Sequence, residues 1–85
     1  MLVIKILGSG CTRCESLYRL TQTAVKELQL DATVEKVGDI QEILTYSVMR
    51  TPALVINEKV ILTGEVPGMT ALKSLLYQIS QNQIQ

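Results

Sequence analysis

The sequence predicts an α/β domain in which strands and helices follow one another in the order βαβαββα. Three observations lead to this prediction. Apolar residues occur in short runs typical of strands, and these runs alternate with stretches in which they recur every three to four residues, as in helices. Gly and Pro separate the segments, and the connections are short. The chain has 85 residues, 47% of them hydrophobic, so residues 1–85 are expected to form one domain around one small core.

Charge and hydropathy exclude several classes of protein. Eight basic and eight acidic residues leave no net charge, and no basic cluster suggests a nucleic-acid partner. The longest apolar run is too short, and too interrupted by Lys5, for a membrane span or a signal peptide. We therefore expect a cytoplasmic protein without nucleic-acid or membrane partners. In that reducing compartment, two neighbouring cysteines are more often catalytic or metal-binding than structural.

The first half of the chain is predicted to form a strand, a helix and a second strand. Residues 2–7 are nearly all apolar, which is typical of a strand buried on both faces of a sheet. A glycine turn follows, and helical spacing of Leu17, Tyr18, Thr21, Val25 and Leu28 then predicts a helix to about Gln29. The β-branched residues of 32–37 predict the second strand, which Gly38 ends.

A second helix is predicted from Asp39 to Met49. Asp39 is a suitable N-cap, and Glu42 follows three residues later in a capping-box arrangement. The helix must end before Pro52. Its predicted apolar face consists of Ile40, Ile43, Leu44 and Val48.

The second half of the chain predicts a β-hairpin and a closing helix. Residues 53–56 and 60–63 are apolar and rich in β-branched side chains, and residues 57–59 between them predict a turn. Beyond Val66-Pro67-Gly68, helical spacing predicts an amphipathic helix, and residues 81–85 are expected to form a frayed polar end. The residues that define this helix are Met69, Leu72, Leu76 and Ile79.

These elements are expected to build a four-stranded mixed sheet with helices on both faces. The first two strands, joined through a helix, form a right-handed parallel unit. The hairpin then adds to the same sheet, with its first strand antiparallel to residues 2–7. This pairing would bring Thr51-Pro52 to the edge of the sheet at which Cys11 emerges.

The two cysteines of the chain, Cys11 and Cys14, directly follow the Gly8-Ser9-Gly10 turn. Cys11 is thereby expected at the start of a helix, where unpaired N–H groups and the helix dipole favour a thiolate. Cys14 comes nearly one turn later on the same side, within reach of a disulfide. We expect the pair to switch between dithiol and disulfide.

Together these features resemble the thioredoxin-like superfamily, and most closely its small members with a glutaredoxin-sized core, the redox-active disulfide proteins. The shared features are a CxxC motif after the first strand, Thr51-Pro52 before the third, a hairpin and a closing helix. The resemblance covers nearly the whole chain. Thioredoxins carry an aromatic residue before the first cysteine and a proline between the two, where this chain has Gly10 and Thr12-Arg13.

The resemblance implies a thiol–disulfide oxidoreductase that acts in electron transport and cell redox homeostasis, with Cys11 attacking a substrate disulfide and Cys14 resolving the mixed disulfide. It also implies a cis Thr51-Pro52 bond, a substrate segment bound to the Thr51 backbone, and a proline ring near the sulfurs. Protein disulfides and a dithiol or reductase donor are the implied partners of a monomer that needs no cofactor. Arg13 is expected either to favour a thiolate through its positive charge or to be a solvated surface residue. The residues expected to bind substrate are Gly10, Thr12, Arg13, Thr51, Pro52 and Gly64. The exposed ring around the site is expected to consist of Gly8, Ser9, Gly10, Thr12, Thr51, Gly64 and Glu65.

Two other functions stay open on the sequence alone. A CxxC motif also binds soft metals such as Cu(I) or Zn(II) through thiolates. Heavy-metal-associated domains, however, follow the order βαββαβ and carry Met where this chain has Ser9, and no His is present to complete a zinc site. The other alternative is a redox-gated binding module without turnover.

Four further residues are expected to have structural roles. Lys5 and Glu35 are expected to form a cross-strand pair between neighbouring strands. Tyr18 is expected at the boundary of the core. Met49 is expected to fill a gap in the interior and not to act as a ligand.

Overall fold

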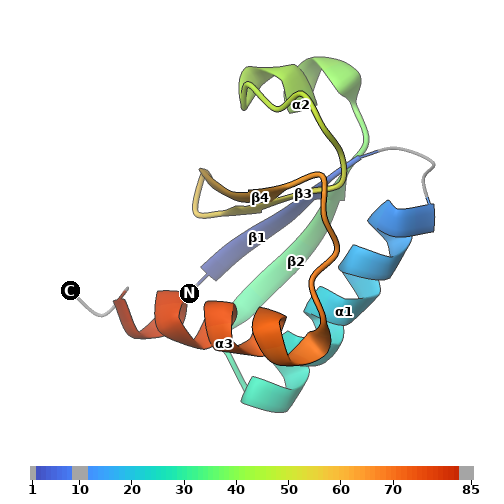
Figure 1. Ribbon diagram of the computed structural model, residues 1–85. Coiled ribbons are helices and arrows are strands. Elements are labelled where there is room, and N and C mark those ends of the chain that lie inside the picture. The colour runs from blue at the N-terminus through green and yellow to red at the C-terminus, as the bar shows by residue number, and fades with distance from the viewer. Residues whose placement is uncertain (1, 9–11, 83–85) are drawn as a thin grey trace.

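Four strands form one mixed sheet with helices on both faces in the computed structural model, which describes residues 2–8 and 12–82 (Figure 1). The order βαβαββα agrees with the sequence-based prediction. The elements are β1 (Leu2–Leu7), α1 (Thr12–Leu28), β2 (Ala32–Val37), α2 (Ile40–Thr45), β3 (Ala53–Ile56), β4 (Lys59–Thr63) and α3 (Met69–Asn82).

The strands lie in the order β2-β1-β3-β4. β1 pairs with β2 in parallel, as expected for two strands that are joined through a helix. β3 runs antiparallel to β1, with Leu7 opposite Ala53. β4 completes the hairpin along the outer side of β3. The carboxyl end of β1 therefore lies beside the start of β3, which is the juxtaposition that the sequence predicts.

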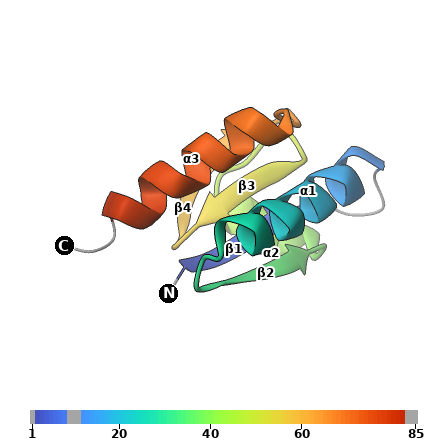
Figure 2. The same ribbon diagram turned by 90° about the horizontal axis from the view of Figure 1, so that it is seen from below.

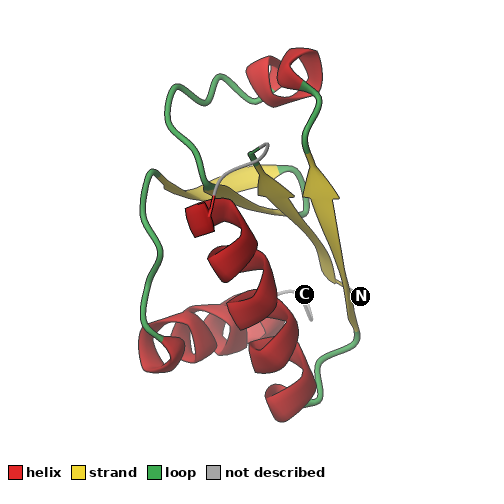
Figure 3. Ribbon diagram, turned by 90° about the vertical axis from the view of Figure 1, so that its right-hand side faces the viewer, coloured by secondary structure: helices red, strands yellow, loops and turns green. Residues whose placement is uncertain are grey.

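Helices α1 and α3 cover one face of the sheet, and α2 lies on the other (Figures 2 and 3). Because side chains alternate along a strand, each face contributes its own apolar cluster. The cluster under α1 and α3 contains Leu2, Ile4, Ile6, Leu17, Ala24, Leu54, Ile56, Leu72 and Leu76. The cluster on the α2 side contains Leu7, Val37, Ile43, Val48, Ala53 and Val55.

Helix α2 is shorter than the sequence predicts. Asp39 caps it as expected, with its carboxylate accepting a hydrogen bond of 3.0 Å from the Gln41 amide. The helix ends at Thr45 and does not continue to Met49, because the chain turns at Tyr46 and Ser47. Ser47 has φ of 59°, a left-handed conformation that ends a helix.

The predicted apolar face of α2 is only partly buried. Ile43 and Val48 enter the core on this side of the sheet. Ile40 is 67% exposed and Leu44 58%, so this part of the predicted apolar face is not buried. Met49 is 91% exposed, which contradicts the expectation that it fills an interior gap. One short helix presents a single turn to the sheet, so the other side chains of the pattern extend into solvent.

Two element boundaries differ from the prediction. Lys59 belongs to β4 and not to the turn, because Asn57 and Glu58 alone reverse the chain, with φ of 50° and 70°. Asn57 also joins the hairpin to β1. Its backbone N–H donates to the Val3 carbonyl, and its side-chain oxygen accepts from the Val3 backbone N–H, each at 2.9 Å. At the other boundary, Gln81 and Asn82 belong to α3, and residues 83–85 lie outside the described part of the chain.

Lys5 forms its ion pair with Glu58 and not with Glu35. Lys5 and Glu35 are register partners in the parallel ladder. The Lys5 ammonium, however, donates to the Tyr46 hydroxyl and to the Glu58 carboxylate, each at 3.0 Å. Tyr46 in turn donates to the second oxygen of Glu58 at 3.0 Å. This cyclic arrangement ties β1, the segment after α2 and the hairpin turn together.

The same contacts shift the ionisation of both charged groups. Hydrogen bonds to Tyr46 and then to Glu58 raise the pKa of Lys5 well above its usual range. The hydrogen bond from Lys5, followed by that from Tyr46, lowers the pKa of Glu58 below its ordinary 4.5. The charged forms of both side chains are therefore favoured in the folded protein.

A first prediction tests which face of α2 is buried. Ile43→Ala should lower the free energy of unfolding by about 2–4 kcal/mol, because it removes buried methyl groups and leaves a cavity. Ile40→Ala in the same helix is the matched control and should cost less than about 0.5 kcal/mol. Urea unfolding of both variants measures the difference. Equal losses of stability would contradict the orientation of α2.

A second prediction concerns the pH dependence of the Glu58 contacts. The pKa of Glu58 is lower in the folded state, so its contribution to stability is complete above the unfolded value of 4.5 and is lost as the pH falls through the folded pKa. The difference in unfolding free energy between wild type and Glu58→Gln should therefore shrink below pH 4.5. It should also shrink in about 1 M salt. A difference that stays constant under acid would show that the carboxylate charge contributes nothing.

Candidate functional site

The candidate site lies at the edge of the sheet where β1 ends and β3 begins. Leu7 and Ala53 are opposite each other, so Gly8 and Pro52 follow at the same edge. The Thr51-Pro52 peptide bond is cis, the isomer that the family resemblance implied. Thr51 is exposed and Pro52 is buried. The Gly64 amide, just after β4, donates to the Pro52 carbonyl at 2.8 Å, so a third segment is joined to this edge.

Cys14 lies in the first turn of α1 and is only 7% exposed. Its sulfur packs against Gly8. A Cβ atom added to Gly8 would overlap the Cys14 Sγ and lie 3.2 Å from the Cys14 Cβ and 3.5 Å from the Thr51 Cβ. Gly8 also has φ of 150°, which side chains disfavour. Glycine is therefore required here on two grounds, and it lets Cys14 and Thr51 approach the same point of the backbone.

Arg13 connects the start of α1 to the segment after β4. One of its guanidinium nitrogens donates to the Gly64 carbonyl at 2.7 Å. Since the Gly64 amide bonds to Pro52, a continuous chain of contacts runs from Arg13 through Gly64 to Pro52. Arg13, Gly64 and Pro52, which the sequence assigned to one site, are thus brought together.

Arg50 is a neighbour of this site that the sequence reasoning missed. Gly64 has φ of 73°, and a Cβ atom added there would lie 3.1 Å from Cδ and 3.2 Å from Cβ of Arg50. The aliphatic part of Arg50 therefore passes close to Gly64. The signal in the sequence was its position directly before Thr51-Pro52.

A cavity of about 630 Å³ opens beside Cys14 and Gly8. In the wall of this cavity, Glu15 forms an ion pair with Lys36 at 2.5 Å and another with Arg19 at 3.7 Å. The hydrogen bond from Lys36 is the main cause that lowers the pKa of Glu15. The Lys36 ammonium also lies 4.7 Å from the centre of the Tyr18 ring, and Tyr18 packs at the boundary of the core as expected. The cavity is lined by Ile6, Gly8, Thr12, Cys14, Glu15, Ser16, Arg19 and Lys36.

The other predicted site residues divide into two groups. Thr12 begins α1, is exposed and borders the cavity beside Cys14. Gly10 and Cys11 lie outside the described residues, as does Ser9. By sequence, Cys11 directly precedes the first residue of α1 and comes three positions before Cys14.

The described part of the chain contains neither a metal-binding cluster nor a membrane-spanning helix. Within residues 2–8 and 12–82, no group of three or more His, Cys, Asp or Glu side chains is arranged to hold a metal ion. In the same ranges, no helix has the length and apolar character needed to cross a membrane.

Comparison with known proteins identifies relatives over most of the chain. The model of a family described as "Thioredoxin domain" matches residues 2–77. A thioredoxin of Methanocaldococcus jannaschii is 36% identical over 76 residues, which cover 89% of this chain and 87% of the relative. A thioredoxin of Methanothermobacter thermautotrophicus is 33% identical over 76 residues, which cover 89% of this chain and 99% of the relative.

Solved structures show the same fold. The structure of a malarial protein matches with a TM-score of 0.71 at 13% identity, covering 92% of this chain and 96% of that one. The solution structure of the oxidised thioredoxin from Plasmodium falciparum matches with a TM-score of 0.67 at 18% identity, covering 93% and 81%. The family match and the two archaeal relatives, together with this fold, show that the chain belongs to the thioredoxin family of thiol–disulfide oxidoreductases.

Proposed function

We propose that this protein reduces disulfides in protein substrates while its own dithiol is oxidised to a disulfide. Cys11 is the attacking cysteine and Cys14 the resolving one. One observation carries the proposal. The Cys14 sulfur packs against the Gly8 backbone at the point where Thr51 also approaches, three positions after Cys11 in the sequence. Membership of the thioredoxin family supports the class of reaction.

The proposed reaction transfers two electrons to the substrate. The Cys11 thiolate attacks one sulfur of a substrate disulfide, the S–S bond breaks, and one substrate thiolate leaves. The product is a mixed disulfide between Cys11 and the other substrate sulfur. Cys14, as a thiolate, then attacks the Cys11 sulfur and releases the second substrate thiolate. The protein is left with a Cys11–Cys14 disulfide, which a dithiol or reductase donor reduces.

Burial assigns the two roles. At 7% exposure, Cys14 is sheltered from a protein substrate, which supports its assignment to the intramolecular, resolving step. The intermolecular attack is therefore assigned to Cys11. In the sequence Cys11 directly precedes α1, and the unpaired N–H groups at the start of a helix favour a thiolate, which supports this assignment.

The surrounding residues are assigned to substrate binding. Thr51 is exposed at the edge of the sheet, so its backbone is available to an extended segment that carries the target disulfide. We also assign Gly10, Thr12, Arg13, Gly64 and the buried Pro52 to substrate binding, Gly10 on its sequence position alone. The absence of a side chain at Gly64 leaves room for the aliphatic part of Arg50, which would lie 3.1 Å from a Cβ atom added there.

A third prediction separates the roles of the two cysteines. Cys11→Ser should abolish the reduction of a peptide disulfide, because the attacking thiolate is gone. Cys14→Ser should still attack but should accumulate the mixed disulfide, because the resolving thiol is missing. Mass spectrometry of the intact protein after mixing with the peptide detects the adduct. Titration of the Cys14→Ser variant should give a Cys11 pKa below the roughly 8.5 of a free thiol.

The same experiment tests the roles of the two cysteines and the alternative of a redox-gated binding module. Identical behaviour of the two variants would overturn the assignment of attacker and resolver. A wild-type protein that binds disulfide partners in stoichiometric amounts, yet reduces none of them with any donor, would replace the proposal with the redox-gated binding module.

A fourth prediction concerns the contact between Gly8 and Cys14. Gly8→Ala should displace the Cys14 sulfur and destabilise the protein by about 1–3 kcal/mol through overpacking. Resolution of the mixed disulfide should slow as well. Gly68→Ala is the matched control, since an added Cβ there has no atom within 4 Å. Urea unfolding and the rate of mixed-disulfide decay measure both effects. Gly8→Ala and Gly68→Ala variants that resolve at the same rate would show that this contact does not position Cys14.

A further inference from the structure

We propose that Arg13 and Arg50 form a basic rim that makes this protein select disulfides flanked by an acidic residue of the substrate. The inference rests on the proposed function and adds a class of substrate to it. It is carried by the convergence of two arginines on one glycine beside the substrate edge, and by the absence of an acidic partner for either within the described residues.

The two arginines come from distant segments. Arg13 lies in the first turn of α1 and donates to the Gly64 carbonyl at 2.7 Å. Arg50 lies in the segment before β3 and passes its aliphatic part close to the Gly64 Cα. Gly64 itself bonds to Pro52, next to the exposed Thr51. A substrate that crosses Thr51 therefore passes close to Gly64, where the Arg13 guanidinium and the aliphatic part of Arg50 lie.

The ion pairs of the described residues do not neutralise the positive charges of Arg13 and Arg50. Across the described residues, the ion pairs join Glu58, Glu15 and Glu27 to the basic side chains Lys5, Arg19, Lys36 and Lys73. None of these pairs includes Arg13 or Arg50, and both arginines are exposed. The carboxylate nearest in sequence to Gly64 is the exposed Glu65, which forms none of these ion pairs either.

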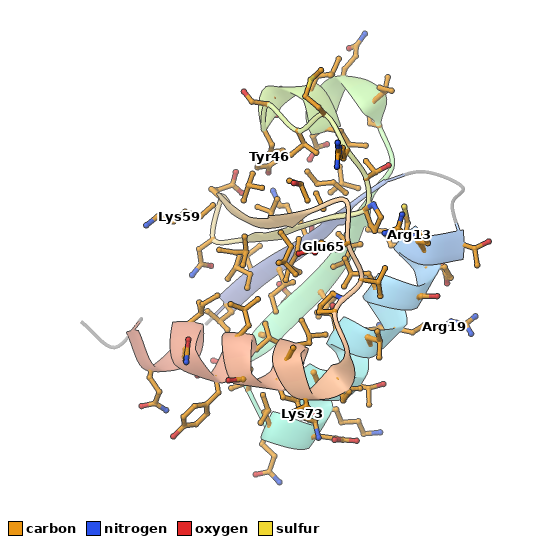
Figure 4. The ribbon with its side chains drawn as sticks, viewed as in Figure 1. Arg13, Arg19, Tyr46, Lys59, Glu65 and Lys73 are labelled. Carbon is orange, nitrogen blue, oxygen red and sulfur yellow. The ribbon has the colours of Figure 1, made fainter. Side chains whose placement is uncertain are left out.

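A guanidinium group is well suited to this selection. It carries five N–H donors, and the hydrogen bond from Arg13 to Gly64 uses one of them. The remaining donors match the two oxygens of a carboxylate. Figure 4 shows Arg13 on the side of α1 that faces the segment carrying Glu65, whereas Lys59 lies across the sheet, away from the site. Lys59 therefore offers a matched cationic control.

The test uses three peptides that carry the same disulfide and differ in the flanking residue, which is Glu, Gln or Lys. Pre-reduced protein in excess reduces each peptide in a single turnover, so no electron donor is needed. Wild type should react fastest with the Glu peptide and slowest with the Lys peptide. The Glu-to-Gln rate ratio should fall towards one when added salt shortens the Debye length from about 30 Å to about 3 Å.

Substitutions assign the preference to individual residues. Arg13→Gln and Arg50→Gln should each lower the Glu-to-Gln rate ratio by about two- to fivefold, as expected for an exposed charge pair. Glu65→Gln should raise the same ratio, because it removes a like charge that competes with the substrate carboxylate. Lys59→Gln makes the same charge change at the opposite end of the sheet and should leave the ratio unchanged.

A binding measurement separates this inference from the proposed reaction. Peptides whose cysteines are S-methylated cannot exchange, and their dissociation constants are measured by NMR titration of the Thr51 and Gly64 amides. Tighter binding of the Glu peptide, lost in Arg13→Gln and Arg50→Gln, supports the basic rim even if no disulfide is reduced. Equal binding and equal rates for Glu and Gln peptides would overturn the basic rim, while leaving the reductase proposal intact.

Discussion

The antiparallel pairing of β1 with β3 is the constraint on which the candidate site depends. With Leu7 opposite Ala53, the end of β1 and the start of β3 share one edge of the sheet, although about 45 residues of sequence separate them. A shift of one residue would turn every side chain of β3 to the other face. The apolar clusters on both faces resist such a shift, because Leu54 and Ile56 belong to one of them and Ala53 and Val55 to the other.

This edge explains why glycines, an arginine and a cysteine are arranged as they are. Gly8 provides a surface without a side chain, against which the Cys14 sulfur packs beside Thr51. Gly64 bonds to Pro52 on one side and accepts from Arg13 on the other. Three segments are thus held together mainly through backbone groups, and Thr51, Arg13 and Arg50 are exposed beside them.

Sequence periodicity predicted the order of elements, because the short apolar runs and the helical spacing between them are strong local signals. The rules of strand connection then predicted the shared edge. Sequence periodicity did not predict the features that depend on tertiary contacts. Helical spacing did not show that Ile40 and Leu44 face solvent, nor that the chain turns at Ser47. The pairing of Lys5 with Glu58 depends on the hairpin folding back, and Arg50 joins the site only through Gly64. Cys11 was predicted from sequence alone and lies outside the described residues.

The most direct measurement equilibrates the protein with dithiol buffers of known potential and follows the NMR amide signals of Gly8, Thr51 and Gly64. A Cys11–Cys14 couple at this edge predicts one shared transition in all three signals. Its slope should be that of a two-electron couple, about 30 mV per tenfold change in the ratio of the two forms. Signals that do not respond, with both cysteines remaining thiols at every potential, would contradict the account.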